Sequence, residues 1–178
     1  MQAEYENRIV DMPRNIEIKA RVADLDALRQ RVIGIAEDGP SVLDQEDTFF
    51  HCAIGRLKVR RFSPTEGELI YYQRADEARP KESRYLRAPT HEPENLIAVL
   101  AAAFGVRAVV RKRREVYLVG QTRVHVDRVQ ELGDFIELEV VLGEGQSVAA
   151  GIAVARQLMG ELQLTKGDLV AGAYVDLL

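Results

Sequence analysis

The feature that most limits how this chain can fold is a strict alternation of charged and apolar residues that begins close to its start. In the segment Asn15-Ile-Glu-Ile-Lys-Ala-Arg21, every second residue is polar or charged and each residue between them is apolar. Successive side chains of a β-strand point to opposite faces, so this segment is predicted to be a strand with one ionic face and one apolar face.

The same pattern returns in later segments, where charged residues again stand two positions apart. The ionic positions are Glu17 and Lys19; Lys58 and Arg60; Lys112 and Arg114; Arg123, His125 and Asp127; and Glu137 and Glu139. The β-rich runs after the first, separated by turn residues, are 44–51, 57–62, 68–74, 82–88, 107–119, 121–130 and 134–142. Each ionic group is therefore expected on one face of its strand.

Apolar residues recur at helical spacing in other segments. The repeat from Leu25 to Ile35 predicts a helix over 24–36, with Asp24 as its cap and Gly39-Pro40 as its stop. Similar spacing predicts helices over 92–104 and 147–160, and a short helix that begins near Thr165. This order of elements predicts an α+β fold with eight strands that are mostly antiparallel.

The length of 178 residues fits one hydrophobic core. We expect a single domain over residues 14–178, preceded by an N-terminal extension over residues 1–13. Two architectures can hold the strands: an open sheet whose ionic face is solvated, or a closed β-barrel with the ionic residues inward and the helices packed outside. The ionic positions are almost all fully charged, with cations and carboxylates on different strands, and this segregation favours a closed, charge-lined tunnel.

Composition limits the binding partners and the cellular location that we expect for this protein. The 24 Lys and Arg against 28 Asp and Glu give a net charge of −4, which argues against a nucleic-acid binder. The single Cys52 excludes an internal disulfide framework and a cysteine-built zinc site. The longest apolar stretch, 96–104, is too short to span a membrane and the start lacks a signal-peptide pattern, so we expect a cytoplasmic protein with no membrane partner.

The two kinds of charge predict a ligand that satisfies both. Glu17, Asp127, Glu137 and Glu139 form a hard oxygen donor set that suits Mg²⁺ or Mn²⁺. The Lys and Arg side chains can bind the oxygens of a chain of phosphates. A triphosphate with a bound divalent metal would occupy such a tunnel, and phosphoryl chemistry needs no separate nucleophile triad.

Several segments, in order, resemble one known family. Asn15-Ile-Glu-Ile-Lys19 resembles the Glu-x-Glu-x-Lys signature of the CYTH superfamily, the triphosphate tunnel metalloenzymes that include class IV adenylyl cyclases and thiamine triphosphatases. The resemblance continues through Asp47-Thr-Phe-Phe50, Gly55-Arg-Leu-Lys-Val-Arg60, Glu68-Leu-Ile-Tyr-Tyr-Gln-Arg74, Lys112-Arg-Arg114 with Tyr117, Val126-Asp127, and Gly133-Asp-Phe-Ile-Glu-Leu-Glu139, and ends near Tyr174.

The resemblance implies an eight-stranded antiparallel tunnel and assigns roles to its residues. Glu17, Asp127, Glu137 and Glu139 are implied to be metal ligands, and Lys19, Lys58, Arg60, Lys112 and Arg114 to bind phosphate. We also expect Arg74 and Arg123 to bind the substrate, and we expect Glu17, Lys19 and Glu137 to be the catalytic residues. Two departures stand out: Asn15 replaces the first Glu of the signature, and Arg74 stands near a position where relatives carry a Lys.

Three functions remain open from the sequence. The first is conversion of ATP to cyclic AMP and pyrophosphate by a metal-dependent lyase. The second is hydrolysis of thiamine triphosphate or inorganic tripolyphosphate. The third is a non-catalytic binder of polyphosphate or nucleotides, against which the presence of all four carboxylates argues. His125 is the one histidine on the ionic face. The oligomeric state is left open, a homodimer included.

Overall fold

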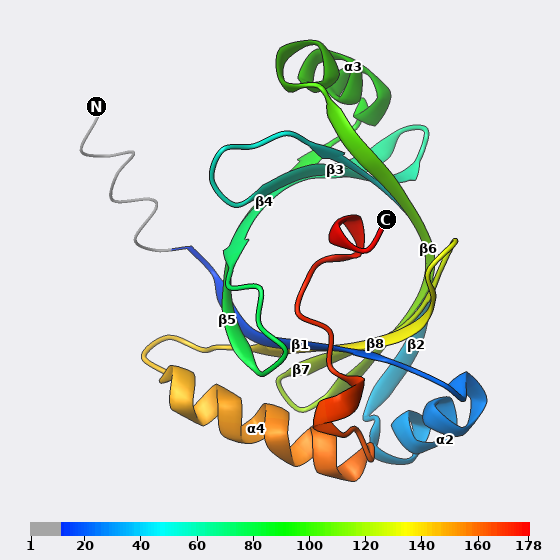
Figure 1. The fold of residues 1–178 in the computed structure, drawn as a ribbon, viewed down its shortest axis with the longest axis vertical. Coiled ribbons are helices and arrows are strands. Elements are labelled where there is room, and N and C mark those ends of the chain that lie inside the picture. The colour runs from blue at the N-terminus through cyan, green and yellow to red at the C-terminus, as the bar shows by residue number, and fades with distance from the viewer. Residues whose placement is uncertain (1–11) are drawn as a thin grey trace.

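The computed structural model describes residues 12–178 and consists of eight strands wound into a ring, with helices on its outside (Figure 1). The strands are β1 (Arg14–Arg21), β2 (Asp38–Phe50), β3 (Arg56–Ser63), β4 (Glu66–Arg74), β5 (Lys81–Thr90), β6 (Val106–Val119), β7 (Thr122–Val129) and β8 (Gly133–Val141). The helices are α2 (Leu25–Ile35), α3 (Pro93–Phe104) and α4 (Val148–Glu161), with short 3₁₀ turns η1 (Lys166–Asp168) and η2 (Tyr174–Asp176).

The strands close into a barrel in the order β1-β5-β4-β3-β2-β6-β7-β8. Every neighbouring pair is antiparallel, and β1 closes the ring because it pairs with β5 on one side and β8 on the other. Two meanders, β2 to β5 and β6 to β8, are joined through the long β2–β6 pairing. The predicted closed tunnel is confirmed, and the open sheet is wrong.

The second strand differs from its prediction at its start. The sequence predicted a strand over 44–51 and treated Gly39-Pro40 only as a helix stop, whereas β2 begins at Asp38 and its register against β6 shifts between Asp38 and Ser41. Gly39 adopts a positive φ of 109°, and a Cβ there would lie 2.6 Å from the carbonyl oxygen of Val116. A glycine is therefore required where β2 passes close to β6.

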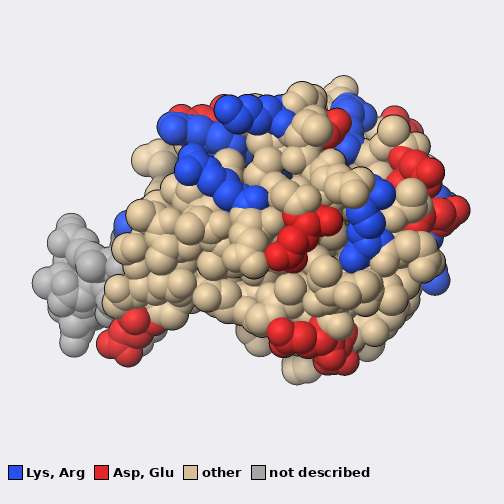
Figure 2. All heavy atoms as spheres, turned by 90° about the horizontal axis from the view of Figure 1, so that it is seen from below, with Lys and Arg blue, Asp and Glu red and all other residues tan. Residues whose placement is uncertain are grey.

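The main hydrophobic core lies outside the ring, between the apolar strand faces and two helices. Ile18 of β1, Val124 of β7 and Leu138 of β8 pack against buried residues of α2 and α4. As predicted, Asp24 caps α2, where its side chain accepts a hydrogen bond from the amide of Ala27 at 2.9 Å. Figure 2 views the helix-covered side, whose surface is mostly uncharged between scattered acidic and basic clusters.

The C-terminal segment closes one end of the barrel. After α4 the chain turns back, and η2 lies inside the ring when the barrel is viewed along its axis (Figure 1). Tyr174 and Val175 pack in a buried cluster with Phe49, Val110 and Phe135 from the strand ends. Asp176 fixes this segment because it accepts hydrogen bonds from Arg56 at 2.6 Å and Arg107 at 2.8 Å.

The first described residues of the chain are held against β5. Residues 1–11 of the expected extension lie outside the described residues, while Met12 is buried and the Pro13 carbonyl accepts a hydrogen bond from the Tyr85 amide. Within residues 12–178, the helices are all too short or too polar to cross a membrane.

Helix α4 approaches the barrel most closely at Gly151, which gives a test of this packing. A Cβ at Gly151 would lie 2.6 Å from Ile16 Cγ1 and from Leu142 Cδ2, whereas a Cβ at Gly160 of the same helix would meet nothing within 4 Å. Gly151→Val should lower the free energy of unfolding by about 2 kcal/mol through overpacking. Gly160→Ala should raise it by about 0.5–1 kcal/mol through helix propensity. Denaturant unfolding measures both, and a neutral Gly151→Val would contradict the close contact.

Candidate active site

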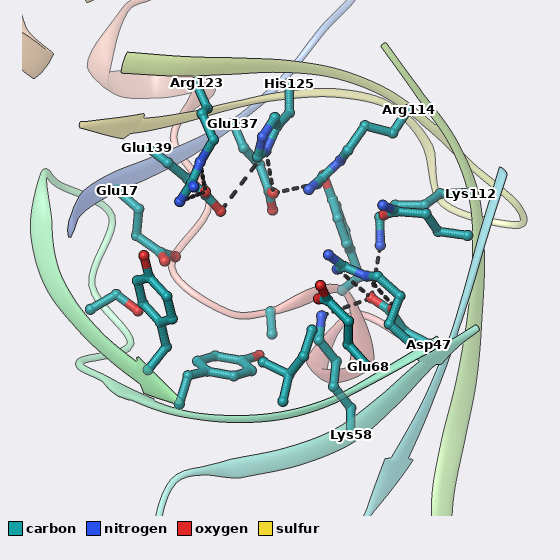
Figure 3. A pocket seen from close by; sticks show the side chains of 18 of the residues that line it. Glu17, Asp47, Lys58, Glu68, Lys112, Arg114, Arg123, His125, Glu137 and Glu139 are labelled. Atoms are coloured by element: carbon teal, nitrogen blue, oxygen red, sulfur yellow. Dashed lines mark hydrogen bonds and ion pairs between the residues drawn. The ribbon is translucent and has the colours of Figure 1, made fainter. Parts of the chain in front are cut away.

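Side-chain alternation directs the ionic residues of the strands into the barrel, where they surround a cavity of about 310 Å³ (Figure 3). Its lining includes eight cations, Lys19, Lys58, Arg60, Arg74, Arg87, Lys112, Arg114 and Arg123, and five carboxylates, Glu17, Asp47, Glu68, Glu137 and Glu139. Asp127 lies behind this lining and is bonded to Arg114. When all of these groups are ionised, six carboxylates against eight cations leave two positive charges in excess, so the cavity favours an anion.

Asp47 of β2 is the centre of a buried cluster of cations. Its Oδ2 accepts hydrogen bonds from the ammonium groups of Lys58 and Lys112, each at 2.8 Å. The guanidinium of Arg60 donates to both carboxylate oxygens, from Nε at 2.8 Å and from Nη2 at 3.0 Å. These three cations come from the two strands that flank β2, so one carboxylate holds together the side chains of three neighbouring strands. The cluster lies on one wall of the cavity (Figure 3).

Burial, together with the crowding of like charges, lowers the pKa values of the two lysines. Burial lowers the pKa of Lys58 to about 7, with help from the neighbouring Arg60 and against the effect of Asp47. Burial also lowers the pKa of Lys112 to about 8, again opposed by Asp47. Burial would raise the pKa of Asp47 itself, but Arg60, Lys112 and Lys58 hold it well below its usual value. One carboxylate thus does not fully compensate the cations around it.

A second cluster centres on Glu137 of β8. Lys19 Nζ donates to Glu137 Oε1 at 2.5 Å, and Arg114 Nη2 donates to Oε2 at 2.5 Å. Burial would raise the pKa of Glu137, but Lys19 and Arg114 hold it well below its usual range, so this carboxylate is ionised at neutral pH.

The closed end of the barrel fixes the orientation of Arg114. Its Nε and Nη2 donate to the two oxygens of Asp127 at 2.6 and 2.5 Å, and the Tyr174 hydroxyl donates to Asp127 Oδ2 at 2.7 Å. The Tyr174 ring also lies under Lys19, whose Nζ is 3.5 Å from the ring centroid. The C-terminal segment therefore positions two of the cavity's cations.

Two further carboxylates of the lining, Glu17 and Glu139, lie on β1 and β8. Strand register places Glu17 opposite Glu139 and Lys19 opposite Glu137, while His125 of β7 lies opposite Glu137 on the other side of β8. Glu17 pairs with Arg74 of β4, and Glu139 accepts a hydrogen bond from Arg123 Nε at 3.0 Å. We call the wall that carries Glu17, Glu137 and Glu139, each paired with a cation, the acidic wall, and the wall around Asp47 the basic wall (Figure 3).

The acidic wall fits a hard divalent cation. Ligand atoms of His125, Glu137 and Glu139 all lie within 4.8 Å of one another, and Glu17 faces Glu139 across the β1–β8 pairing. Asn15, where the signature has its first Glu, lines the same cavity, and its buried Oδ1 makes no hydrogen bond within the described residues. Carboxylate and amide oxygens are ligands that suit Mg²⁺ or Mn²⁺.

Most of the site residues predicted from the sequence meet in this cavity. Glu17, Lys19, Lys58, Arg60, Arg74, Lys112, Arg114, Arg123, Glu137 and Glu139 all line it. Asp127 lies apart from the other three predicted metal ligands, because its fully buried carboxylate is engaged by Arg114 and Tyr174.

Sequence reasoning gave no role to Asp47 or Tyr174. Asp47 begins the segment Asp47-Thr-Phe-Phe50, which resembles the family, and this resemblance is the feature of the sequence that could have indicated a role for it. Tyr174 stands near the end of the resemblance, but nothing in its neighbourhood indicates that the chain re-enters the barrel.

Apolar side chains line the cavity toward the end opposite Tyr174. Leu43 of β2, Phe62 of β3 and Val116 of β6 are all lining residues, and their strands are adjacent. Each stands two positions beyond an inward polar residue of its strand, on the side away from the C-terminal segment. We name Leu43, Phe62 and Val116 the apolar arc. It offers a surface for an uncharged part of a ligand whose anionic part lies deeper.

Comparisons with known proteins agree with this architecture. The CYTH domain family model matches residues 13–174, while no curated protein matches in sequence. A Pyrococcus horikoshii OT3 protein is 25% identical, with a TM-score of 0.83 over 92% of this chain and 99% of its own. A proposed adenylate cyclase from Vibrio parahaemolyticus is 19% identical, with a TM-score of 0.74 over 92% of this chain and 96% of its own. A proposed adenylyl cyclase from Hippeastrum, described as having a dominant triphosphatase activity, is 15% identical, with a TM-score of 0.58 over 89% and 91%.

The lowered pKa values of the lysines predict that anion binding takes up protons. At pH 8, Lys58 and Lys112, with pKa values of about 7 and 8, are partly neutral in the free protein, and a bound anion favours their charged form. Affinity for sulfate, which does not titrate here, should therefore fall as the pH rises from about 6.5 to 9. Calorimetry in buffers of different ionisation enthalpy measures the proton uptake.

Two matched variants separate the proton uptake of Lys58 from the effect of removing any one positive charge. Lys58→Met should reduce the proton uptake at pH 8, whereas Lys166→Met, at an exposed position, should leave it unchanged. Sulfate binding without proton uptake in the unmodified protein would contradict the lowered lysine pKa values.

Proposed function

The chain belongs to the CYTH domain family, and from this premise we propose that it is a metal-dependent enzyme that acts on a triphosphate compound, converting ATP to cyclic AMP and pyrophosphate. The observation that carries the proposal is the cavity itself, in which a cluster of cations around Asp47 lies across from the three carboxylates Glu17, Glu137 and Glu139. A chain of phosphates and a divalent cation together would neutralise both walls.

The basic wall supports binding of a chain of phosphates. Lys58 and Lys112 each donate one hydrogen bond to Asp47, and an ammonium group has three donors, so further donors can bind ligand oxygens. Lys19 and Arg114 extend this wall toward Glu137. Arg114 donates two hydrogen bonds to Asp127, which also accepts one from the Tyr174 hydroxyl, and these contacts orient its guanidinium for a ligand.

The acidic wall supports the metal part of the proposal. Glu17, Glu137 and Glu139 would hold Mg²⁺ or Mn²⁺, which supplies charge neutralisation and polarisation at phosphoryl oxygens when bound. In the proposed reaction the oxygen of the ribose 3′-hydroxyl attacks the α-phosphorus, the bond from that phosphorus to the pyrophosphate oxygen breaks, and the hydroxyl proton leaves with the pyrophosphate. Lys19 and Arg114 would stabilise the negative charge that grows on the departing pyrophosphate. The closed end of the barrel would limit the access of water from that side.

The apolar arc supports an organic triphosphate over an inorganic one. Leu43, Phe62 and Val116 would contact the base and ribose while the phosphates lie among the cations. The Vibrio parahaemolyticus relative is named as a proposed adenylate cyclase, which agrees with a nucleotide. The Hippeastrum relative is described as having triphosphatase activity, so hydrolysis of the terminal phosphate is the second candidate. Both reactions would use the same cations and carboxylates.

Product analysis tests the proposal directly. With Mn²⁺ or Mg²⁺ present, ATP should yield cyclic AMP and pyrophosphate, and Glu137→Gln should lower the turnover by about 100-fold or more because a metal-facing carboxylate is lost. Glu144→Gln, at an exposed position, should retain full turnover. Orthophosphate as the product supports hydrolysis instead. Full turnover in Glu137→Gln, or the absence of turnover with both ATP and tripolyphosphate, would contradict the proposal.

The same assay tests the apolar arc. Phe62→Ala should raise the KM for ATP by about tenfold, the effect of about 1.4 kcal/mol of lost apolar contact. The affinity for inorganic tripolyphosphate, measured in parallel, should stay within about twofold, because that ligand has no apolar part. Equal losses for both ligands would show that Phe62 acts on the cavity as a whole and not on the organic group.

A further inference from the structure

His125 is a buried side chain without a hydrogen-bond partner at the one nitrogen that faces the carboxylates. It is 5% exposed, and its Nδ1 makes no hydrogen bond within the described residues. Nδ1 lies 3.7 Å from Glu137 Oε2 and 3.9 Å from Glu139 Oε1 (Figure 3). Buried polar atoms are rarely left unpaired, so this arrangement calls for a bound group between the imidazole and the two carboxylates.

The separations of His125 Nδ1 from the two carboxylates agree with ligands of one ion. Two ligand atoms at about 2.1 Å from a metal are about 3 Å apart when adjacent and about 4.2 Å apart when opposite. The measured separations of 3.7 and 3.9 Å fall between these values. They are too long for direct hydrogen bonds and short enough for coordination after small side-chain movements.

The carboxylate oxygens near His125 can be released from their present partners. Arg114, which donates to Glu137 Oε2, also makes two hydrogen bonds to Asp127 at 2.6 and 2.5 Å, so it stays paired when Oε2 takes up an ion, while Lys19 keeps its hydrogen bond to Oε1. Arg123 donates to Oε2 of Glu139, while the oxygen that faces His125 is Oε1. A cation can thus enter without leaving a buried arginine unpaired.

An imidazole nitrogen changes the metal that such a site prefers. Mg²⁺ favours oxygen ligands and water, whereas first-row transition ions bind imidazole well and follow the order Mn²⁺, Fe²⁺, Co²⁺, Ni²⁺. We propose that His125 ligates the divalent ion through Nδ1 together with Glu137 and Glu139. The tunnel then binds a transition ion such as Mn²⁺ more tightly than Mg²⁺. This inference rests on the proposed function for the presence of a metal and adds its identity.

Electron paramagnetic resonance of bound Mn²⁺ tests the inference without a measurement of activity. Pulsed spectra of the full chain with Mn²⁺ should show a ¹⁴N coupling, which should change to a ¹⁵N coupling when the histidines are labelled with ¹⁵N. This labelling uses the unmodified protein and does not depend on the folding of a variant. Titration should also show tighter binding of Mn²⁺ than of Mg²⁺.

Two variants identify the nitrogen. His125→Gln should remove the nitrogen coupling and weaken Mn²⁺ binding by about tenfold or more, while Mg²⁺ binding changes by less than about threefold. His91→Gln, at an exposed position, should leave both unchanged. Bound Mn²⁺ without nitrogen coupling, or no bound Mn²⁺, would overturn the inference. A nitrogen coupling together with no turnover of any triphosphate would instead overturn the proposed function.

Discussion

The rest of the structure depends on the neutralisation of buried charges by one another inside a closed ring of strands. Asp47 illustrates the constraint, since one carboxylate with almost no exposure accepts hydrogen bonds from two lysines and an arginine. Burial of an unpaired charge is strongly unfavourable, so each of these groups is retained only because the others are present. The compensation is incomplete, as the lowered pKa values of Lys58 and Lys112 indicate. A ligand with several negative charges would complete it.

The barrel makes this arrangement possible because its sheet has the ionic face inside and the apolar face outside, whereas a sheet packed around an apolar interior has the opposite order. Apolar residues of β1, β7 and β8 face outward and are covered by α2 and α4, while their ionic neighbours face inward. Closing the ring through β1 then places the carboxylates of β1 and β8 across the cavity from the cation cluster around Asp47 of β2. The C-terminal segment makes the two ends of the barrel different, since Tyr174 fills one end and the apolar arc lies toward the other.

The sequence alone predicts the strands and their inward faces because alternation is a local property. Glu17, Lys19 and Glu137 could be placed on ionic faces from their spacing, and the structure brings all three into the cavity. The pairing of Asp47 with Lys112 could not be predicted in this way, because it depends on the β2–β6 contact between residues 65 positions apart. The alternation of β7 places Asp127 on the ionic face of its strand. Its burial next to Tyr174 could not be predicted, because it depends on where the C-terminal segment enters the barrel. The early start of β2 was hidden because Gly39-Pro40 was interpreted as the stop of the preceding helix, which ends at Ile35.

Thermal unfolding with inorganic tripolyphosphate tests the central claim most directly. If the cations of the cavity lack a sufficient anionic partner, tripolyphosphate at a hundred times its dissociation constant should add about 2.7 kcal/mol to the free energy of unfolding. Sodium chloride of equal ionic strength should not reproduce this stabilisation. Equal effects of the two salts would show that the inward charges are already balanced, and would contradict the account.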